Sequence, residues 1–350
     1  MKRTRVLVVE DSLTVRHRLL EILQADAQLE VVGAAEDGKQ AIEQCLALRP
    51  DIMTLDMMLP LMTGLAVTEY VMAHCPTPIL IVSASFNRGE LYRTYDALAA
   101  GAVEAIEKPG LQDADDQWAQ EFVAMVKLVA RVKAITHLRG RLTSMPADPL
   151  RTGPTPTKST GPGISLVAIG ASTGGPGALV EILRALPVSR TPILIVIHIG
   201  EPFGAGFAEW LDGQTPHSVR FPRDGELLTP QVVLLAPPGL HLVVRNQRVW
   251  LADTPERHSC RPSVDVLFES IAAHYKGRIL ACLLTGMGQD GARGLLAIRQ
   301  AGGFTIAQDE ASSVVYGMPH QAALLGAAAQ ILPLGEIGPS IAAQITAQQR

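Results

Sequence analysis

The fold is first indicated by the stretch RVLVVEDS at residues 5–12, in which an apolar run ends in two acidic residues. Such a run is typical of a buried strand, and apolar residues at helical spacing follow it. The same alternation recurs to about residue 135. We expect strands at Arg5–Glu10, Glu30–Ala35, Asp51–Asp56, Pro78–Ser83 and Ala102–Ile106, with helices such as Thr14–Gln24 and Lys39–Leu48 between them and a last helix from about Asp116 to about Leu138. Repeated strand–helix units predict an α/β domain with a parallel sheet and helices on both faces.

A second alternating region starts at Ile164, after a stretch rich in proline and glycine. That stretch cannot bury an apolar face, so we predict a first domain at 1–138, a linker at 139–163 and a second domain at 164–350. We expect strands there at Ser165–Gly170, Pro192–His198, Val232–Ala236, Arg278–Thr285 and Phe304–Ala307, and helices at Gly177–Ala185, Ser263–His274, Gly291–Gln300 and Pro319–Leu325. The segments His241–Val244 and Val249–Ala252 predict an antiparallel hairpin added to the parallel core.

The composition is that of a globular protein of about two domains. The chain has 350 residues, 47% hydrophobic and 18% charged, and a formal net charge of −4. This balance gives no support to a nucleic-acid partner. The four cysteines form no C-x-x-C pair, so we expect reduced thiols rather than disulfides or a zinc site. No signal peptide and no membrane-spanning run is expected, and we predict a cytoplasmic protein without membrane insertion.

Acidic residues and a lysine follow the strands of the first domain. In a parallel sheet the carboxyl ends of strands gather ligands, so we expect Glu10, Asp11, Asp56, Ser83 and Lys108 to share one edge. Close carboxylates need a cation, and a set of oxygen ligands at Glu10, Asp11 and Asp56 favours Mg²⁺. Lys108 and Ser83 can contact a phosphoryl group, and Asp56 is the natural nucleophile toward a phosphoryl donor.

Over about residues 3–130 the chain resembles a response-regulator receiver domain. The matching elements are VLVVEDS, Asp56 with Pro60 and Gly64 downstream, SAS at 83–85 and AGAVEAIEKP ending at Pro109. The resemblance implies a (βα)5 fold with Asp56 as the phosphoacceptor, Mg²⁺ held by Glu10 and Asp11, and Ser83 and Lys108 as the switch residues. It also implies a histidine kinase as the phosphodonor. The chain departs from the pattern at Ala105, where relatives usually carry an aromatic switch residue.

The second domain contains the turn Gly170-Ala171-Ser172-Thr173-Gly174, which satisfies the G-x-S-x-G pattern between a strand and a helix. Its glycines permit a sharp turn that raises a serine hydroxyl above the sheet. The alternative is a structural helix cap; a nucleotide-binding loop is less well matched. His198 ends the next strand, and Asp290 lies in a glycine-rich loop after a third strand. Ser172 would then attack a substrate, His198 would move the proton and Asp290 would orient the imidazole.

Further groups near this edge are candidates for oxyanion binding, for orienting the imidazole and for substrate contact. Backbone N–H groups of Thr173, His198 or Met287 are candidates for an oxyanion hole. Asp265 and Asp309 are alternatives to Asp290 as the acid that orients the imidazole, although the glycines around Asp290 favour Asp290. Among the basic side chains Arg257, His258, Arg261 and Arg293, we favour Arg261 for substrate contact; ordinary surface charge is the alternative for each.

The second half is similar to the catalytic domain of chemotaxis-type protein-glutamate methylesterases, over about residues 164–335. The segments that carry this resemblance are IGASTGGP, HSCRPSVDVLF, LTGMGQDGARG and IAQDEASSVVYGMP. It implies a doubly wound α/β domain and a triad of Ser172, His198 and Asp290 that needs no cofactor for ester hydrolysis. It also implies that the substrates are methylated chemoreceptors, whose glutamate γ-methyl esters are hydrolysed and whose glutamines are often deamidated.

Two domains with different sites suggest a control mechanism. Our hypothesis is that the unphosphorylated first domain covers the esterase edge and that phosphorylation of Asp56 weakens this docking. Two alternatives stay open at this point. One is a related hydrolase that acts on other esters or amides. The other is a binding module without catalysis, although no helix-turn-helix pattern or basic stripe favours DNA.

Overall fold

A computed structural model describes residues 2–84, 88–108, 116–132, 164–199, 203–274 and 279–346. The chain divides into two compact units, Met1–Ala147 and Asp148–Arg350. The linker predicted at 139–163 lies outside the described residues. Within the described ranges, no helix is both long enough and apolar enough to cross a membrane.

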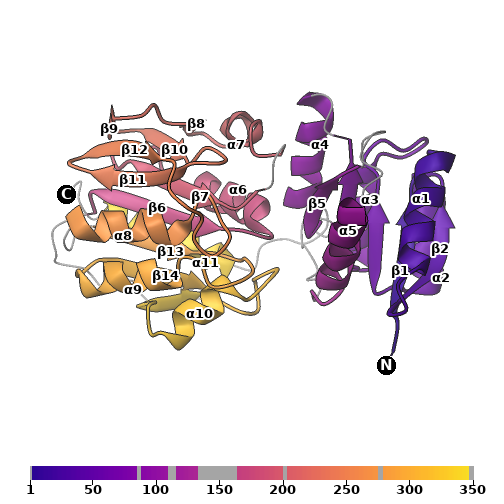
Figure 1. Ribbon diagram of the computed structural model, residues 1–350. Helices are drawn as coiled ribbons and strands as arrows, with labels where there is room; N and C mark the ends of the chain where they lie inside the picture. The colour runs from indigo at the N-terminus through magenta and orange to yellow at the C-terminus, as the bar shows by residue number, and fades with distance from the viewer. Residues whose placement is uncertain are drawn as a thin grey trace, which may run out of the picture. The chain divides into compact units, whose positions relative to one another are not determined.

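The first unit, drawn in indigo and purple in Figure 1, is a five-stranded parallel sheet with the strand order β2-β1-β3-β4-β5. Its strands are β1 (Thr4–Val9), β2 (Leu29–Ala35), β3 (Ile52–Leu55), β4 (Ile79–Ser83) and β5 (Glu104–Glu107). Its helices are α1 (Leu13–Gln24), α2 (Gly38–Leu48), α3 (Gly64–His74), α4 (Arg88–Ala99) and α5 (Asp116–Val129). Helix α1 packs against α5, whereas α3 packs between α2 and α4, so the helices form two layers. The predicted (βα)5 architecture is confirmed.

Short polar side chains start the helices that follow the first three strands. Ser12, Asp37 and Thr63 each accept a hydrogen bond from the backbone N–H three residues further on. Each therefore satisfies one of the donors left unpaired at a helix N-terminus. Ser12 and Thr63 thereby fix the ends of the loops after β1 and β3, and these loops carry the acidic residues of the site.

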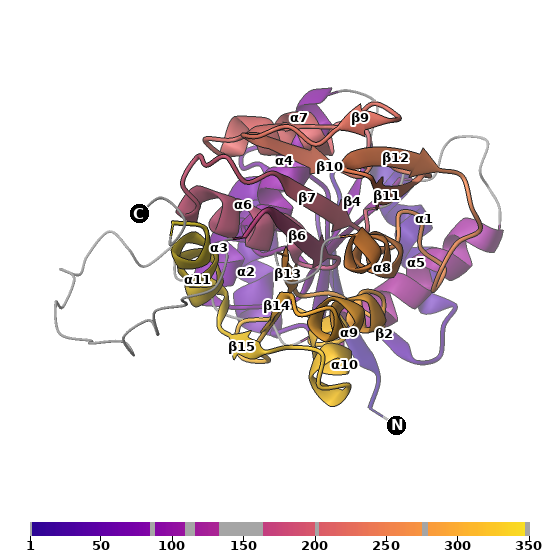
Figure 2. The same cartoon turned by 90° about the vertical axis from the view of Figure 1, so that its left-hand side faces the viewer.

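The second unit is a seven-stranded parallel sheet with the strand order β15-β14-β13-β6-β7-β10-β8. Its strands are β6 (Leu166–Ala171), β7 (Ile193–Ile197), β8 (Ser218–Arg220), β10 (Val232–Leu235), β13 (Ile279–Leu283), β14 (Phe304–Gln308) and β15 (Gln330–Leu332). Figure 2 shows α6 (Gly175–Ala185) and α11 (Leu334–Thr346) on one face, and α8 (Val264–His274) and α9 (Ala292–Gln300) on the other. Two shorter helices, α7 (Phe207–Gln214) and α10 (Met318–Leu324), complete the unit. This is the doubly wound fold that was expected.

The predicted hairpin forms a small sheet of its own. Strands β11 (His241–Arg245) and β12 (Arg248–Ala252) pair antiparallel, and β9 (Glu226–Leu227) joins β12. Asn246 and Gln247 between them have φ values of 49° and 59°, as a tight two-residue hairpin turn requires. The apolar side chains Leu242, Val244 and Val249 are buried against the core below, so the hairpin covers α8 rather than extending the main sheet.

The boundaries of the predicted strands and helices differ from the observed ones by a residue or two. One prediction was wrong by more: the last helix of the first unit ends at Val129, and residues 130–132 form a turn. The remainder of its expected range, 133–138, lies outside the described residues. The central strands of both sheets, β3 in the first unit and β6, β7 and β13 in the second, are entirely buried. Such strands read as continuous apolar runs, which is why the sequence located them well.

Candidate functional site

The strand order of the first unit brings the acidic residues together at one edge. Strands β1 and β3 are neighbours, so Glu10 and Asp56, each one residue beyond its strand, lie side by side. Carboxylate oxygens of Glu10, Asp11 and Asp56 lie within 4.8 Å of one another. Lys108, just after β5, places Nζ 2.8 Å from Glu10 Oε2 and 2.9 Å from Asp56 Oδ2. Four of the predicted site residues are therefore in one cluster.

The electrostatics of this cluster explain its need for cations. Burial and the neighbouring Asp56 carboxylate raise the pKa of Glu10 to about 7. Burial acts to lower the pKa of Lys108, but the charges of Asp56 and Glu10 outweigh it and the pKa is raised. Three oxygen donors of this kind fit Mg²⁺, with Glu10, Asp11 and Asp56 as the residues that would hold it. When bound, the ion would supply positive charge to the oxygens of an incoming phosphoryl group.

Ser83 and Ala105 lie on the strands next to this cluster. Ser83 is the last residue of β4 and is buried, and its backbone O accepts the Lys108 N–H at 3.0 Å. The Ser83 hydroxyl is 3.4 Å from Ala84 O. The serine is thus at the expected edge, beside the backbone that carries the lysine. Ala105 lies within β5, paired with Ile81, and its methyl group packs against the domain core.

Ser172 lies at the turn that connects β6 with α6, as the G-x-S-x-G pattern predicted. The Gly175 N–H donates to Ser172 O at 2.6 Å, which closes the turn, and Gly174 has a φ of 78°. A side chain at Gly174 would also collide with Val314, since an added Cβ would lie 2.6 Å from its Cβ. Glycine is therefore required at this position. The turn leaves the Ser172 side chain half-buried at the edge of the sheet.

His198 and the loop of Asp290 reach the same edge from the strands on either side of β6. Ala171 pairs with Ile197 on β7, so Ser172 and His198 are each the next residue beyond a pair in register. On the other side, the Ser172 N–H donates to Thr285 O at 3.0 Å, and Ser172 Cβ packs against Gly286. The helices after β6 and β13 lie on opposite faces of the sheet (Figure 2). Ligands bind at such a switch point in open α/β sheets.

Asp290 holds both the histidine and the N-terminus of α8. Its Oδ2 lies 2.9 Å from His198 Nε2 and accepts the Val264 N–H at 2.7 Å. Its Oδ1 accepts from Ser263 Oγ at 2.7 Å and from the Asp265 N–H at 3.0 Å. Burial acts to raise the pKa of Asp290, but the hydrogen bonds from His198, Ser263 and Asp265 outweigh it and the pKa is lowered. Asp290 is therefore a buried carboxylate with every oxygen in use.

The contact with Asp290 sets the state of the imidazole. Because Asp290 is ionised and can only accept, His198 Nε2 carries the proton, and the lone pair of the neutral ring is on Nδ1. Burial acts to lower the pKa of His198, but Asp290 and the nearby Cys260 thiol outweigh it and raise the pKa to about 9. Within the described residues, Ser172 Oγ makes no hydrogen bond to this ring.

Two of the three backbone N–H groups predicted for the oxyanion hole remain candidates. The His198 N–H donates to Ala171 O at 3.1 Å, so it is already used in the sheet and we no longer regard it as a candidate. The Met287 N–H donates to no group within the described ranges, and it stays a candidate. Thr173 follows Ser172 directly, and its carbonyl accepts from Thr285 Oγ1 at 2.9 Å. It also stays a candidate.

The structure separates the rival acids from Asp290. Asp265 is buried but accepts the Gly294 N–H at 2.6 Å and lies 3.2 Å from His258 Nε2. Asp309 caps its own loop by accepting from the Ser312 N–H at 2.9 Å. Within the described residues, neither contacts His198, so only Asp290 is placed to orient the imidazole.

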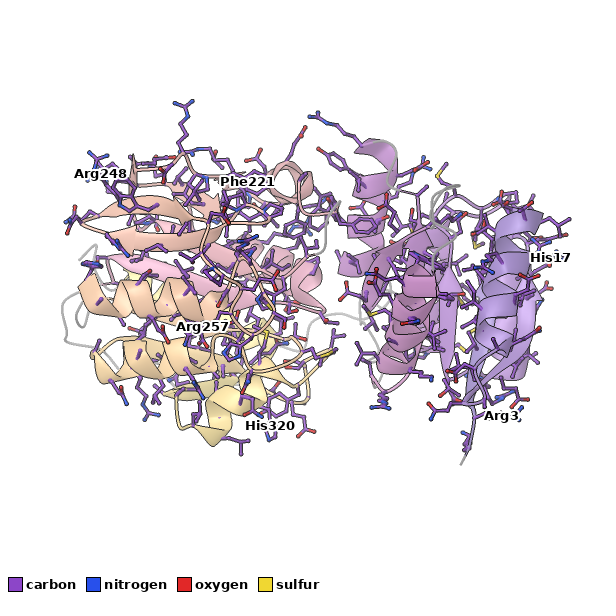
Figure 3. The ribbon with its side chains drawn as sticks, viewed as in Figure 1. Arg3, His17, Phe221, Arg248, Arg257 and His320 are labelled. Carbon is purple, nitrogen blue, oxygen red and sulfur yellow. The ribbon has the colours of Figure 1, made fainter. Side chains whose placement is uncertain are left out.

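The basic side chains around the site are largely occupied by acidic partners. Arg261, the favoured substrate contact, donates from Nη1 to Asp253 Oδ1 at 2.6 Å. Arg257, labelled in Figure 3, makes two hydrogen bonds to Glu269, at 2.5 and 2.7 Å. Arg293 is exposed. Both hydrogen bonds that the Arg261 side chain makes, to Asp253 Oδ1 and Thr254 O, come from Nη1, and its buried Nε has no partner among the described residues. Its role in substrate contact stays a prediction.

Sequence reasoning missed three residues that shape the site. Ser263 donates to Asp290, and His241 accepts the Ser263 N–H at Nδ1, at 3.1 Å. Cys260 Sγ lies 3.7 Å from His198 Nδ1. Ser263 had a detectable signal: it began the helix expected at Ser263–His274, and a serine at a helix start is typical of an N-cap residue, which is its place directly before α8. His241 and Cys260 had none, because each reaches the site from a different loop or strand of the fold.

Comparisons with known proteins identify the families to which the two domains are similar. The chain matches the family model of the CheB methylesterase over residues 167–341 and that of the response regulator receiver domain over residues 6–115. A Pseudomonas aeruginosa relative named protein-glutamate methylesterase/protein-glutamine glutaminase 2 is 43% identical over 345 residues, which cover 97% of this chain and 96% of the relative. A Burkholderia lata relative named protein-glutamate methylesterase/protein-glutamine glutaminase 1 is 43% identical, with 89% and 91% covered. The crystal structure of the Thermotoga maritima CheB methylesterase catalytic domain is 35% identical and matches 51% of this chain and 97% of that one, with a TM-score of 0.49.

The fold and the two sites define a protein that joins a receiver domain to a hydrolase domain. The chain belongs to the CheB methylesterase family, in the form that carries a response regulator receiver domain. The resemblance seen in the sequence is thereby confirmed for the family and for the fold.

Proposed function

We propose that this chain is a phosphorylation-activated hydrolase that removes methyl groups from glutamate γ-methyl esters of chemoreceptors and also deamidates receptor glutamines. Relatives named protein-glutamate methylesterase/protein-glutamine glutaminase match almost the whole chain, which supports this substrate class. The observation that carries the proposal is the pair of half-buried His198 and buried Asp290, 2.9 Å apart, on the sheet edge next to Ser172. The partners would be a histidine kinase as phosphodonor and methylated receptors as substrate.

The chemistry follows from these three residues. Ser172 Oγ would attack the ester carbonyl carbon while its proton moves to His198 Nδ1, and the Met287 and Thr173 N–H groups would face the oxyanion. His198 would then protonate the leaving methanol, which breaks the ester C–O bond and leaves an acyl-enzyme. Water would attack the acyl-enzyme by the same proton transfers in reverse. With a glutamine substrate the leaving group would be ammonia.

The raised pKa of His198 predicts an alkaline pH profile. General-base catalysis needs the neutral ring, and the pKa of about 9 means that this form becomes dominant only above that pH. We expect kcat/KM to rise about tenfold per pH unit below the pKa and to level off above it. The measurement is methanol release from methylated receptor fragments with a chelator present, after subtraction of the rate with Ser172→Ala. A flat profile from pH 6 to 9 would contradict the assignment of His198 as the base.

The receiver site supplies the control. A carboxylate oxygen of Asp56 would attack the phosphorus of the kinase phosphohistidine, so that an O–P bond forms while the P–N bond breaks and the imidazole leaves. The phosphoryl group would then lie beside Lys108, which contacts Asp56 at 2.9 Å. The new charge of about −1.5 to −2 would draw Lys108 from Glu10 toward the phosphoryl oxygens. The hydroxyl of Ser83, at the end of the neighbouring strand, could follow. This signal cannot be transmitted through the rotation of an aromatic ring at position 105, because that residue is Ala105.

Replacing the phosphoacceptor should abolish activation by the phosphodonor but not ester hydrolysis itself. We expect Asp56→Asn to take up no phosphoryl group from a small phosphodonor and to show the same esterase rate with and without it. The control is Asp26→Asn, because Asp26 is an aspartate of the same domain that pairs with Lys127, at 2.6 Å, away from the site. This control should be phosphorylated and activated like the wild type. Equal activation of Asp56→Asn would rule out Asp56 as the acceptor.

A test of substrate class compares three reactions of the full chain. Methanol release from methylated receptor fragments, ammonia release from receptor fragments with glutamine, and hydrolysis of unrelated small esters are measured side by side. We expect the receptor fragments to be preferred. A preference for unrelated esters would instead support a hydrolase outside chemotaxis.

A further inference from the structure

The thiol of Cys260 faces the imidazole of the catalytic pair. Cys260 lies in the loop before α8, where its N–H and carbonyl form a small bridge with Arg257. Its Sγ is 3.7 Å from His198 Nδ1, although 62 positions separate the two residues in the sequence. The side chain of His198 is 15% exposed and Cys260 is half-buried, so small ions in solvent can reach the pair. The mechanism described above makes no use of this thiol.

The separation of the two atoms matches a shared tetrahedral metal. With Zn–S of about 2.3 Å and Zn–N of about 2.1 Å, a tetrahedral angle places sulfur and nitrogen about 3.6 Å apart. The observed 3.7 Å differs little from this value. A Zn²⁺ ion could therefore be held by Cys260 Sγ and His198 Nδ1 without movement of the backbone. Ligand atoms of His198, Cys260 and Asp290 all lie within 4.8 Å of one another.

The far side of the imidazole is arranged as it is in metal-binding histidines. Such histidines donate the N–H that does not face the metal to a carboxylate, which fixes the tautomer and makes the ring a better ligand. Here Asp290 Oδ2 is 2.9 Å from Nε2 and is itself held by the Val264 N–H. Asp290 therefore leaves the lone pair on Nδ1, directed at the side where Cys260 lies. The same carboxylate would serve catalysis and metal binding.

We infer that Cys260 and His198 form a site for a thiophilic divalent cation of the zinc class, and that its occupation inhibits the hydrolase. The thiol would lose its proton to solvent as the S–Zn bond forms, a ring that is protonated at Nδ1 would lose that proton as the N–Zn bond forms, and water would fill the remaining positions. One thiolate and one imidazole favour Zn²⁺ over Mg²⁺, so the carboxylate site of the receiver would not compete. Because the ion takes the lone pair of Nδ1, His198 could no longer accept the proton of Ser172. The spacing of the cysteines gave no sign of this site, and we expected none from the sequence.

Cobalt binding tests the site without reference to activity. Co²⁺ takes the place of Zn²⁺ in such sites and gives a thiolate-to-metal absorption band in the near ultraviolet. The full chain, reduced and free of metal, is titrated with Co²⁺. We expect the band in the wild type and in the control Cys75→Ala, which removes a different thiol, and its loss in Cys260→Ser. His198→Gln should weaken Co²⁺ binding at least tenfold while the thiol remains. A band that persists in Cys260→Ser, or is missing from the wild type, would overturn the site.

The inhibition is tested on the same variants, and this part alone rests on the proposed function. Each variant is compared with its own metal-free rate of methanol release, in constant Mg²⁺. We expect Zn²⁺ to inhibit the wild type and Cys75→Ala reversibly, with recovery on addition of a chelator. Cys260→Ser should need at least tenfold more Zn²⁺ for half-inhibition. Equal sensitivity of Cys260→Ser and the wild type would overturn the inference. If the wild type released no methanol at all, the proposed function would fail, while the cobalt band would still decide whether the metal site exists.

Discussion

Ser172→Ala is expected to reduce kcat for methyl ester hydrolysis by a factor on the order of 10⁴ to 10⁶, the range seen when the nucleophile of a serine hydrolase is removed. The reason is that Ser172 is the residue directly after β6, where the sheet brings the chain beside His198. KM should change little, because the substitution removes only one oxygen atom. The measurement is methanol release from methylated receptor fragments under steady-state conditions.

Two comparisons make the Ser172 result specific. Ser218→Ala changes an exposed serine of the same domain on β8 and should leave kcat at the wild-type value. Thermal unfolding should be unaffected in both variants, since within the described residues the Ser172 hydroxyl makes no hydrogen bond that the fold would lose. If Ser172→Ala kept most of its activity, hydrolysis by this serine would be excluded. The chain would then be better described as a phosphorylation-controlled binding module.

Asp290→Asn should have the second largest effect, with kcat lowered by about 10⁴, as for the equivalent change in a serine protease triad. An amide at this position would present an N–H₂ group to some of the donors that now surround the carboxylate. His198 would lose both its proton acceptor and its fixed tautomer. The loss of charge-assisted hydrogen bonds at the start of α8 should also reduce the free energy of unfolding, by about 1–3 kcal/mol.

The control for Asp290 has to separate catalysis from stability. Asp265→Asn provides it, because Asp265 is also fully buried at the start of α8 and accepts a backbone N–H, from Gly294. Within the described residues, Asp265 makes no contact with His198. We expect a similar loss in the free energy of unfolding, measured by denaturant titration, but only a modest fall in kcat. An equal fall in kcat for the two variants would mean that the effect of Asp290 is structural.

The sequence predicted the residues of the receiver site more completely than the contacts of the hydrolase site. In the receiver domain all the expected residues are at the expected edge, because Glu10, Asp56, Ser83 and Lys108 each lie at or one residue beyond the end of a strand, and Asp11 follows Glu10. In the second domain the same reasoning located Ser172, His198 and the loop of Asp290. It could not show that the His198 N–H is used in the sheet or that Arg261 is paired with Asp253. Both depend on which strands and loops become neighbours.

The sequence by itself determined the alternation of strands and helices, the division into two domains and the residues at the carboxyl ends of the strands. These are local properties, since hydrophobic periodicity and glycine-rich turns act within a few residues of chain. Only the tertiary structure decided that Asp290 rather than Asp265 holds the imidazole, that the free lone pair is on Nδ1 and that this nitrogen faces Cys260. Those contacts join residues 62 and 92 positions apart, and the packing of α8 and its loop against the sheet edge sets their distances and orientations.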